Sequence, residues 1–286
     1  MKGEHTVDLL CEMLTVSRSG YYRWKSAGPC KRERDDAALA PKVAQAHRRS
    51  RRTYGAPRVM RELRAQGVKT SKRRCARLLR ALGLQGARRR RGKPRTTDSR
   101  HGQAPAPNRL AQMSPPNGPD QVWVTDITYI ETGDGWLYLA AILDLWSRRI
   151  VGWACAPTLH AGPVLCALQR ALRHRRPSHG LLHHSDRGVQ YVCADYVSAL
   201  VAAGIERSMS RAGNCYDNAA MESFWSTLKL DTGIDIHVPA TRRAAELVIF
   251  DYLETFYNPT RCHSSQDHLF PVAFEKLQHQ TTKTAA

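Results

Sequence analysis

The sequence predicts a protein of the α/β class, with a mixed five-stranded sheet flanked by helices and an all-α region in front of it. Two patterns lead to this prediction. Apolar residues recur at helical spacing through roughly the first 85 residues. Beyond residue 120, short β-rich segments alternate with helical ones. The chain has 286 residues, enough for two domains that each bury a core.

The N-terminal region, residues 1–85, begins with three expected helices. Apolar residues spaced i, i+3, i+4 and i+7 predict the first over 7–14. Ser17 can cap a short second helix, and a third is expected over 34–48. Because the first two are short, they give only weak evidence for a DNA-binding fold.

The next two helices form a clearer helix-turn-helix. Pro57 suits the first turn of one helix and Gly67 can end it. Ser71 can cap the other, whose inner side carries apolar residues at i, i+3, i+4 and i+7. Its other side is densely cationic, with Lys72, Arg73, Arg74, Arg77 and Arg80. Such a helix after a short turn fits a recognition element, and a solvated bundle helix is the alternative.

The distribution of charge supports nucleic-acid binding. Residues 1–110 carry 29 Lys and Arg against 8 Asp and Glu, a net charge of +21. Residues 111–286 carry 15 against 17, a net charge of −2. This asymmetry is typical of a nucleic-acid-binding region joined to a neutral body, although a merely solubilising basic surface is the alternative. We therefore expect the cations at 72, 73, 74, 77 and 80 to contact DNA. Residues 86–119 are basic and proline-rich and are expected to form a linker that lies along phosphates.

The C-terminal region, residues 120–280, is predicted to form the sheet. Three hairpin-linked strands followed by alternating helices and strands match an RNase H-like mixed sheet. The strands are expected at 122–131, 136–143, 150–156, 181–185 and 205–208, and the helices at 161–175, 194–203, 217–230 and 241–257.

The remaining composition narrows the class of protein. None of the eight cysteines forms a C-x-x-C pair, so they are expected to be free core residues rather than disulfides or zinc ligands. No apolar run approaches the roughly 18 residues that a membrane helix needs, and no export segment is visible at the N-terminus. A cytoplasmic location without membrane contact is therefore expected.

Asp126 is the first candidate site residue. It lies within a strand that is apolar on both faces, and such a strand is buried in its sheet. A buried carboxylate needs a cationic partner, either a metal ion or an ion pair. Because no Arg or Lys occurs from 110 to 147, we favour a metal ion over a salt bridge.

Two further acids complete the candidate set. Asp186 follows an apolar strand, where ligands gather in α/β sheets, although a lone Asp there is often only a turn residue. Glu222 flanks the apolar stripe of a helix that Asp217 or Asn218 could cap. Since adjacent strand residues point to opposite faces, at most one of His183 and His184 could reach the site, and packing is the preferred interpretation for both.

Several segments together resemble one family. They are YGAPRVMRELRAQG and CARLLRALGL within 54–84, WVTDITYI (123–130), LDLWSRRIVGW (143–153), HHSDRGVQY (183–191), GNCYDNAAMESFWSTLK (213–229) and YNPTRCHSS (257–265). The chain is similar to the integrase-core transposases of bacterial insertion sequences, of the second-reading-frame (orfB) type, which are related to retroviral integrases. The resemblance covers nearly the whole chain.

The resemblance implies a catalytic role for the three acids. Asp126, Asp186 and Glu222 match the D-D-(35)-E arrangement and would hold two Mg²⁺ or Mn²⁺ ions for cleavage and transfer of DNA strands. Lys229 matches the basic residue of the family and is expected at a phosphate, with an ion pair to Glu222 or Asp231 as the alternative. Arg261 is expected to contact DNA as part of a tail signature that includes Asn258 and His263, whose roles stay open.

The resemblance also implies partners. These are the terminal inverted repeats of the element, target DNA, further copies of the chain assembled on DNA, and an upstream-frame product that family members often join by frameshifting. In the cell the chain would associate with the nucleoid. Two other functions stay open: a DNA-binding regulator built on an inactive core, and an RNase H-like nuclease that cuts without joining.

Overall fold

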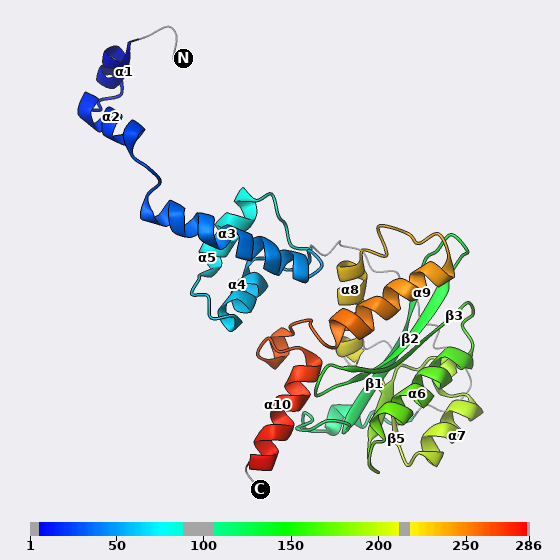
Figure 1. Cartoon of the computed structure of the whole chain (residues 1–286). Coiled ribbons are helices and arrows are strands. Elements are labelled where there is room, and N and C mark those ends of the chain that lie inside the picture. Colours follow the sequence, from blue (N-terminus) through cyan, green and yellow to red (C-terminus); the bar gives the residue numbers. More distant parts are fainter. Residues whose placement is uncertain (1–5, 88–105, 212–217, 285–286) are drawn as a thin grey trace. The chain divides into compact units, whose positions relative to one another are not determined.

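The computed structural model describes residues 6–87, 106–211 and 218–284 (Figure 1). The chain divides into two compact units, Met1–Gly86 and Ala87–Ala286. Most of the linker predicted over 86–119 lies outside the described residues.

The first unit contains five helices among its described residues. They are α1 (Val7–Met13), α2 (Arg18–Ser26), α3 (Lys31–Arg49), α4 (Ala56–Ala65) and α5 (Lys72–Ala81). The predicted caps are present, since the Ser17 hydroxyl accepts from the Gly20 N–H and the Ser71 hydroxyl from the Arg74 N–H. Helix α3 starts a few residues earlier than predicted because the Glu33 carboxylate caps it by accepting from the Cys30 N–H.

Helices α3, α4 and α5 share one core. The helical spacing correctly placed seven of their buried side chains on the inner faces: Leu39, Val43, Val59, Leu63, Cys75, Leu78 and Leu79. Leu82, the last residue of the predicted apolar side of α5, is instead 40% exposed because it lies just beyond the end of the helix. Helix α4 has Pro57 in its first turn, and Gly67, just beyond its end, adopts a positive φ of 78°. The helix-turn-helix of the sequence analysis therefore has the expected inward packing.

The second unit is built on a five-stranded mixed sheet. Its strands are β1 (Val122–Ile130), β2 (Leu137–Asp144), β3 (Ile150–Ala156), β4 (Leu182–Ser185) and β5 (Glu206–Met209), in the order β3-β2-β1-β4-β5. The first three pair antiparallel, while β4 runs parallel to β1 and to β5. Each strand lies within one residue of its predicted bounds.

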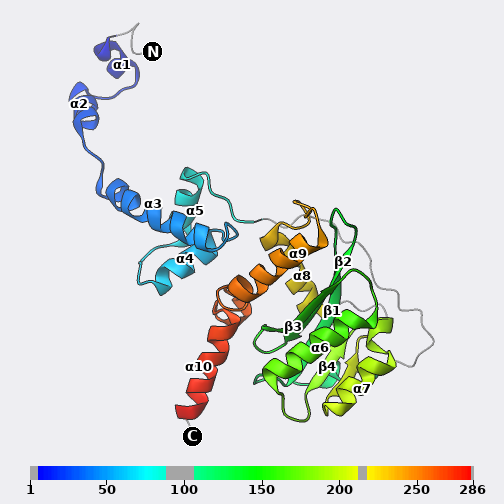
Figure 2. The same cartoon turned by 45° about the vertical axis from the view of Figure 1, so that its right-hand side comes forward.

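Helices cover both faces of this sheet (Figures 1 and 2). Helices α6 (Ala161–Arg175) and α7 (Ala194–Ala202) pack on one face over a core that includes Trp123. Helices α8 (Ala219–Thr232) and α9 (Arg242–Asp251) lie on the other. Gly152 lets α6 approach β3 closely, because a Cβ there would stand 2.2 Å from the Ala167 carbonyl oxygen.

The C-terminal part differs from the prediction in two ways. The expected helix over 241–257 changes at Asp251 into a π-helical turn, Tyr252–Tyr257, whose three aromatic side chains are buried. Helix α10 (Pro271–Thr284) was not predicted. It is fixed by Glu275, which is buried and accepts from Arg149 and Arg175 at 2.7 and 2.9 Å. Such partners lie far away in sequence, so helical spacing alone could not reveal them.

Among the described residues, 3₁₀ turns also lie at Leu110–Gln112, Val189–Tyr191 and Ser264–Gln266. None of the helices in the described part of the chain has the length and apolar character needed to cross a membrane.

Candidate active site

Strand register brings Asp126 and Asp186 together. Strand β1 pairs in parallel with β4 so that Val122 lies opposite Leu182 and Val124 opposite His184. Continuing the same register two residues further sets Asp126 level with Asp186, just beyond the last residue of β4. The two carboxyl groups therefore meet at the centre of the sheet, next to the carboxyl end of β4.

Both aspartates are held by N–H donors. The Oδ1 atom of Asp126 accepts from the Ile127 N–H at 2.8 Å, and Oδ2 accepts from the Trp225 indole at 2.9 Å. The Oδ1 atom of Asp186 accepts from the Gly188 N–H at 2.9 Å. None of the described Lys or Arg side chains forms an ion pair with Asp126, which agrees with the lack of basic residues noted in its strand.

The surroundings of Asp126 oppose its negative charge. Burial is the largest cause that raises the pKa of Asp126, and the charge of Asp186 is the second. The hydrogen bonds from Trp225 and Ile127 act in the opposite direction, and the charge of Glu222 raises the pKa by the least. The net pKa is well above the usual range for Asp, so the ionised pair is under electrostatic stress without a cation.

Helix α8 carries Glu222 in its first turn and lies along β1. Asn218 donates to the Thr125 carbonyl at 3.2 Å, and Lys229 donates to the Tyr129 carbonyl at 3.0 Å. Glu222 is thus within electrostatic reach of Asp126. However, no three or more His, Cys, Asp and Glu side chains among the described residues are gathered closely enough to hold a metal ion. Asp126 therefore interacts more strongly with Asp186 than with Glu222.

The donor set nevertheless suits a divalent metal ion. All three groups offer carboxylate oxygens, the ligands that Mg²⁺ and other hard cations prefer. A cation between Asp126 and Asp186 would also remove the repulsion that raises the pKa of Asp126.

The two histidines near the site are packing residues, as the strand alternation predicted. His183 is paired with the Tyr196 hydroxyl at 3.1 Å, and burial lowers its pKa to about 3. His184 is paired with the hydroxyls of Ser208 and Ser210 at 2.8 and 3.2 Å. Both rings are buried and neither replaces a carboxylate of the site.

Arg261 requires a correction, because the structure contradicts its expected contact with DNA. Its side chain is only 5% exposed, and it donates to Asp231 of α8 at 2.5 Å. The Tyr252 hydroxyl donates to the same carboxylate at 2.9 Å. A buried guanidinium with a buried partner cannot reach a phosphate, so Arg261 has a structural role between α8 and the tail.

The other tail residues also act within the fold. Asn258 accepts from the Ile150 N–H and donates to the Ile150 carbonyl, both at 3.0 Å, and so continues the hydrogen bonding of β3. The His263 ring packs edge-on against Tyr257, with ring centroids 4.9 Å apart. Lys229 is engaged by Tyr129 and lies 3.4 Å from Asp235, not from Glu222 or Asp231. Its contact with phosphate stays a prediction.

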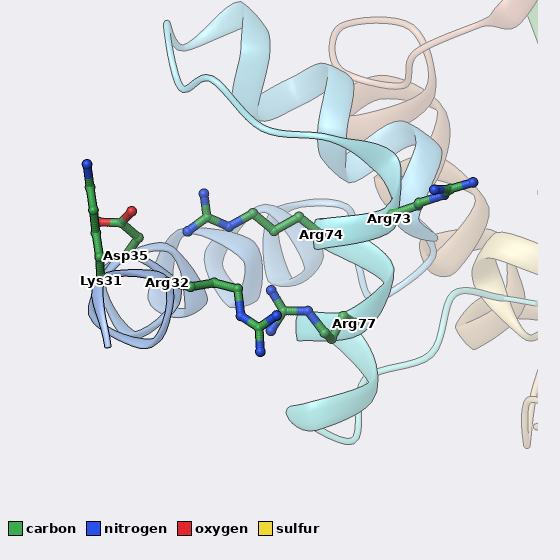
Figure 3. A pocket seen from close by; sticks show the side chains of 6 residues that line it. All are labelled: Lys31, Arg32, Asp35, Arg73, Arg74 and Arg77. Carbon is green, nitrogen blue, oxygen red and sulfur yellow. The ribbon is translucent and has the colours of Figure 1, made fainter. Parts of the chain in front are cut away.

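In the first unit, a cationic cleft of about 650 Å³ lies between α3 and α5 (Figure 3). It is lined by Lys31, Arg32, Asp35, Arg73, Arg74 and Arg77. Asp36, which is mostly buried, accepts from Arg74 at 2.7 Å and from Arg77 at 2.5 Å. The side chains of Arg74 and Arg77 therefore extend toward α3 (Figure 3). Arg77 is still exposed, as are Lys72, Arg73 and Arg80.

Sequence reasoning missed several residues that shape these sites. Trp225 was counted only as part of an apolar stripe, and Asn218 only as a cap. Asp36, Lys31 and Arg32 were not singled out. Their hydrogen bonds connect elements far apart in the chain, and no local spacing signals such contacts.

Comparison with known proteins agrees with this organisation. Residues 116–215 match the integrase core domain, and residues 33–92 match an HTH-like domain. The insertion element IS600 uncharacterized 31 kDa protein of Shigella sonnei is 43% identical over 271 residues, 95% of this chain and 99% of that protein. The transposase InsF for insertion sequence IS3A of Escherichia coli (strain K12) is 38% identical over 276 residues, 96% of this chain and 95% of that protein.

Among solved structures, the chain is similar to the HTLV-2 integrase catalytic core domain in complex with magnesium (dimeric form). The TM-score is 0.42 and the identity 13%, covering 56% of this chain and 98% of that one. The strand order and the integrase-core match make the second unit an RNase H-like domain. An HTH-like domain precedes this core, and the chain is 38% identical to InsF over 96% of its length. The chain therefore belongs to the IS3 family of insertion-sequence transposases, of the second-reading-frame type.

Proposed function

We propose that this transposase cuts and joins DNA strands by metal-assisted phosphoryl transfer at Asp126, Asp186 and Glu222. The observation that carries the proposal is the pair of carboxyl groups on β1 and after β4, which raise each other's energy when both are ionised. Such a pair is costly in a protein interior unless a cation compensates it.

The chain's own residues would supply the ligands and the geometry. Asp126 and Asp186 would bind Mg²⁺ or Mn²⁺, and Glu222 would approach from α8 to complete a site for two ions. When bound, such ions stabilise charge on the transferring phosphoryl group and promote ionisation of the attacking hydroxyl. Trp225 and the Ile127 N–H would keep Asp126 oriented during the reaction.

Two successive displacements at phosphorus account for the transposition chemistry. A water oxygen attacks the phosphate at the element end, a P–O bond forms, and the P–O3′ bond breaks to release a 3′-hydroxyl. That hydroxyl then attacks a phosphate of the target strand, and a target 3′-oxygen leaves. The first displacement is a hydrolysis that leaves a 5′-phosphate on the flanking strand. The second exchanges one phosphoester bond for another, so joining requires no external energy source and no covalent bond to the protein.

The first unit would bind the DNA. The cleft between α3 and α5 and the exposed cations Lys72, Arg73 and Arg80 offer positive charge suited to phosphates. The ligands would be the terminal inverted repeats and the target DNA. Pairing two ends would involve further copies of the chain and, as in family members made by frameshifting, an upstream-frame product. Binding to chromosomal DNA would associate the protein with the nucleoid.

The test is an assay of strand cleavage and joining with element-end DNA and Mg²⁺. Asp126→Asn, Asp186→Asn and Glu222→Gln should each abolish both reactions by at least about a thousandfold while leaving DNA binding intact. Asp195→Asn and Glu206→Gln, two exposed acids, make the same chemical changes away from the site and should leave activity unchanged.

The products distinguish the competing functions. Cleavage retained in any of the three site variants would remove that residue from the active site. Cut but unjoined DNA from the wild-type protein would indicate a nuclease, and DNA binding without any Mg²⁺-dependent product would indicate a regulator.

A further inference from the structure

One hydrogen bond of the site is not explained by apolar packing. Trp225 belongs to the buried stripe of α8 and is only 7% exposed, so a Phe or Leu could fill much of its volume. Its indole Nε1, however, donates to Oδ2 of Asp126 at 2.9 Å. A buried indole N–H requires an acceptor, and here the acceptor is the first acid of the site.

The hydrogen bonds leave the Asp126 carboxylate in one defined orientation. Oδ1 receives the Ile127 N–H and Oδ2 receives the Trp225 N–H, so each oxygen has one donor. Since a carboxylate oxygen has two lone pairs, one on each oxygen remains available for a cation. Rotation of the carboxyl group would break both hydrogen bonds at once.

The same hydrogen bond links two acids of the site. Trp225 follows Glu222 by three residues, less than one helical turn, on α8. The bonds from Asn218 to Thr125 and from Lys229 to Tyr129 fix the helix to backbone carbonyls of β1. Of these three bonds to β1, the one from Trp225 ends on a carboxylate, so it couples the orientation of Asp126 to the position of the helix that carries Glu222.

We propose that Trp225 is a positioning residue of the metal site: its indole N–H holds the Asp126 carboxylate in the orientation that binds the ion and keeps the Glu222 helix in register with it. The inference rests on the proposed function of the three acids. Groups that orient metal ligands in this way commonly change metal affinity by about 10–100-fold when they are removed.

The test compares two Trp→Phe variants of the full chain by titration with Mn²⁺. Electron paramagnetic resonance measures the concentration of free Mn²⁺ at each point of the titration. Trp225→Phe should weaken Mn²⁺ binding by at least about tenfold. Trp153→Phe is the matched control, because Trp153 is also buried and also donates to a carboxylate, that of Glu254, at 2.9 Å. It should bind Mn²⁺ as the wild type does.

The kinetics should separate positioning from substrate binding. At low Mn²⁺ concentration, Trp225→Phe should join DNA strands more slowly than the wild type. At saturating Mn²⁺ its rate should return most of the way to the wild-type rate, and its KM for DNA should be unchanged throughout. A Trp225→Phe protein that is folded and binds Mn²⁺ with wild-type affinity would overturn the inference. If the variant does not fold, 3-benzothienylalanine at position 225 keeps the bicyclic shape and replaces only the N–H with sulfur. Its Mn²⁺ affinity then decides in the same way.

Asp126→Asn separates this inference from the proposed function. If Asp126→Asn loses Mn²⁺ binding while the Trp225 variants keep it, only the positioning role is wrong. If Asp126→Asn binds Mn²⁺ as tightly as the wild type, the metal site itself is wrong and the role of Trp225 is wrong with it.

Discussion

At the scale of single residues, the stability of the protein without metal should depend on the ionisation of Asp126. Burial and the charge of Asp186 raise the pKa of Asp126 from its ordinary value to about 7. The folded state therefore holds a proton that the unfolded state has already released over the window from about pH 4 to pH 7. Across that window the free energy of unfolding should fall as the pH rises, and the decrease should be complete above it.

Asp126→Asn should remove this dependence, because an amide does not ionise. In the presence of a chelator, the free energy of unfolding of the wild type should fall by up to about 4 kcal/mol between pH 4 and pH 8. That of Asp126→Asn should not show this decrease. Chemical unfolding at a series of pH values measures this difference. Asp195→Asn should follow the wild type, and parallel curves for the wild type and Asp126→Asn would contradict the account.

At the scale of elements, helix α8 is fixed at both ends. Its first part is bound to β1 through Asn218 and Trp225, and its last part is bound to the tail through Asp231 and Arg261. Since Glu222 lies between these attachments, the stability of the tail contributes to the position of the third acid. The tail signature is therefore explained by the support of a helix rather than by contact with DNA.

Arg261→Met should destabilise the protein by about 3–5 kcal/mol, because it leaves the buried Asp231 without its cation. The double variant Arg261→Met with Asp231→Leu should recover part of this stability, since no charge then stays buried alone. Urea unfolding gives both values. A folded Arg261→Met protein of normal stability with weaker DNA binding would instead favour a contact between Arg261 and DNA.

The elements show what sequence alone could establish. Hydrophobic spacing and the caps Ser17 and Ser71 were sufficient for the helices of the first unit. Short β-rich segments between helical ones were sufficient for the strands, although β1 is apolar on both faces. Asp126 was singled out because it lies in an apolar strand without a nearby cation, whereas the set of three acids with Asp186 and Glu222 was predicted from the resemblance to the integrase-core transposases.

Local patterns did not reveal three features. The partner of Trp225 lies about a hundred positions away and that of Arg261 lies thirty positions away. Helix α10 depends on buried ion pairs of Glu275 with distant arginines.

At the scale of the whole molecule, binding and chemistry are assigned to different units. The excess of positive charge lies mainly in the first unit, where 21 Lys and Arg stand against 7 Asp and Glu (net +14), and the acidic pair lies in the second unit. In the first unit, the hydrogen bonds from Arg77 and Arg74 lower the pKa of Asp36, so this acid stays ionised and holds both arginines at the cleft. Two acids, Asp35 and Asp36, stand against the five cations that line the cleft, which leaves an excess of positive charge for phosphates.

Replacing Lys31 and Arg32 by Ala should therefore weaken binding equally to element-end and unrelated DNA. It should also reduce the slope of the logarithm of affinity against the logarithm of salt concentration by about 0.9 for each phosphate that is no longer neutralised. Fluorescence anisotropy at several salt concentrations measures the slope. The control, Arg173→Ala with Lys276→Ala, removes the same charge from exposed positions of the second unit. Equal slopes for the cleft variant and the wild type would exclude the cleft as a phosphate site.

The most direct test of the account is a crystal structure of the full chain soaked in Mn²⁺, with the ions located by anomalous diffraction. The account predicts manganese peaks within coordinating distance of Asp126 and Asp186, with Glu222 drawn in from α8 as a further ligand. Manganese bound elsewhere, or no peak beside Asp126 in crystals that hold the ion at other sites, would contradict a shared metal site for these three acids.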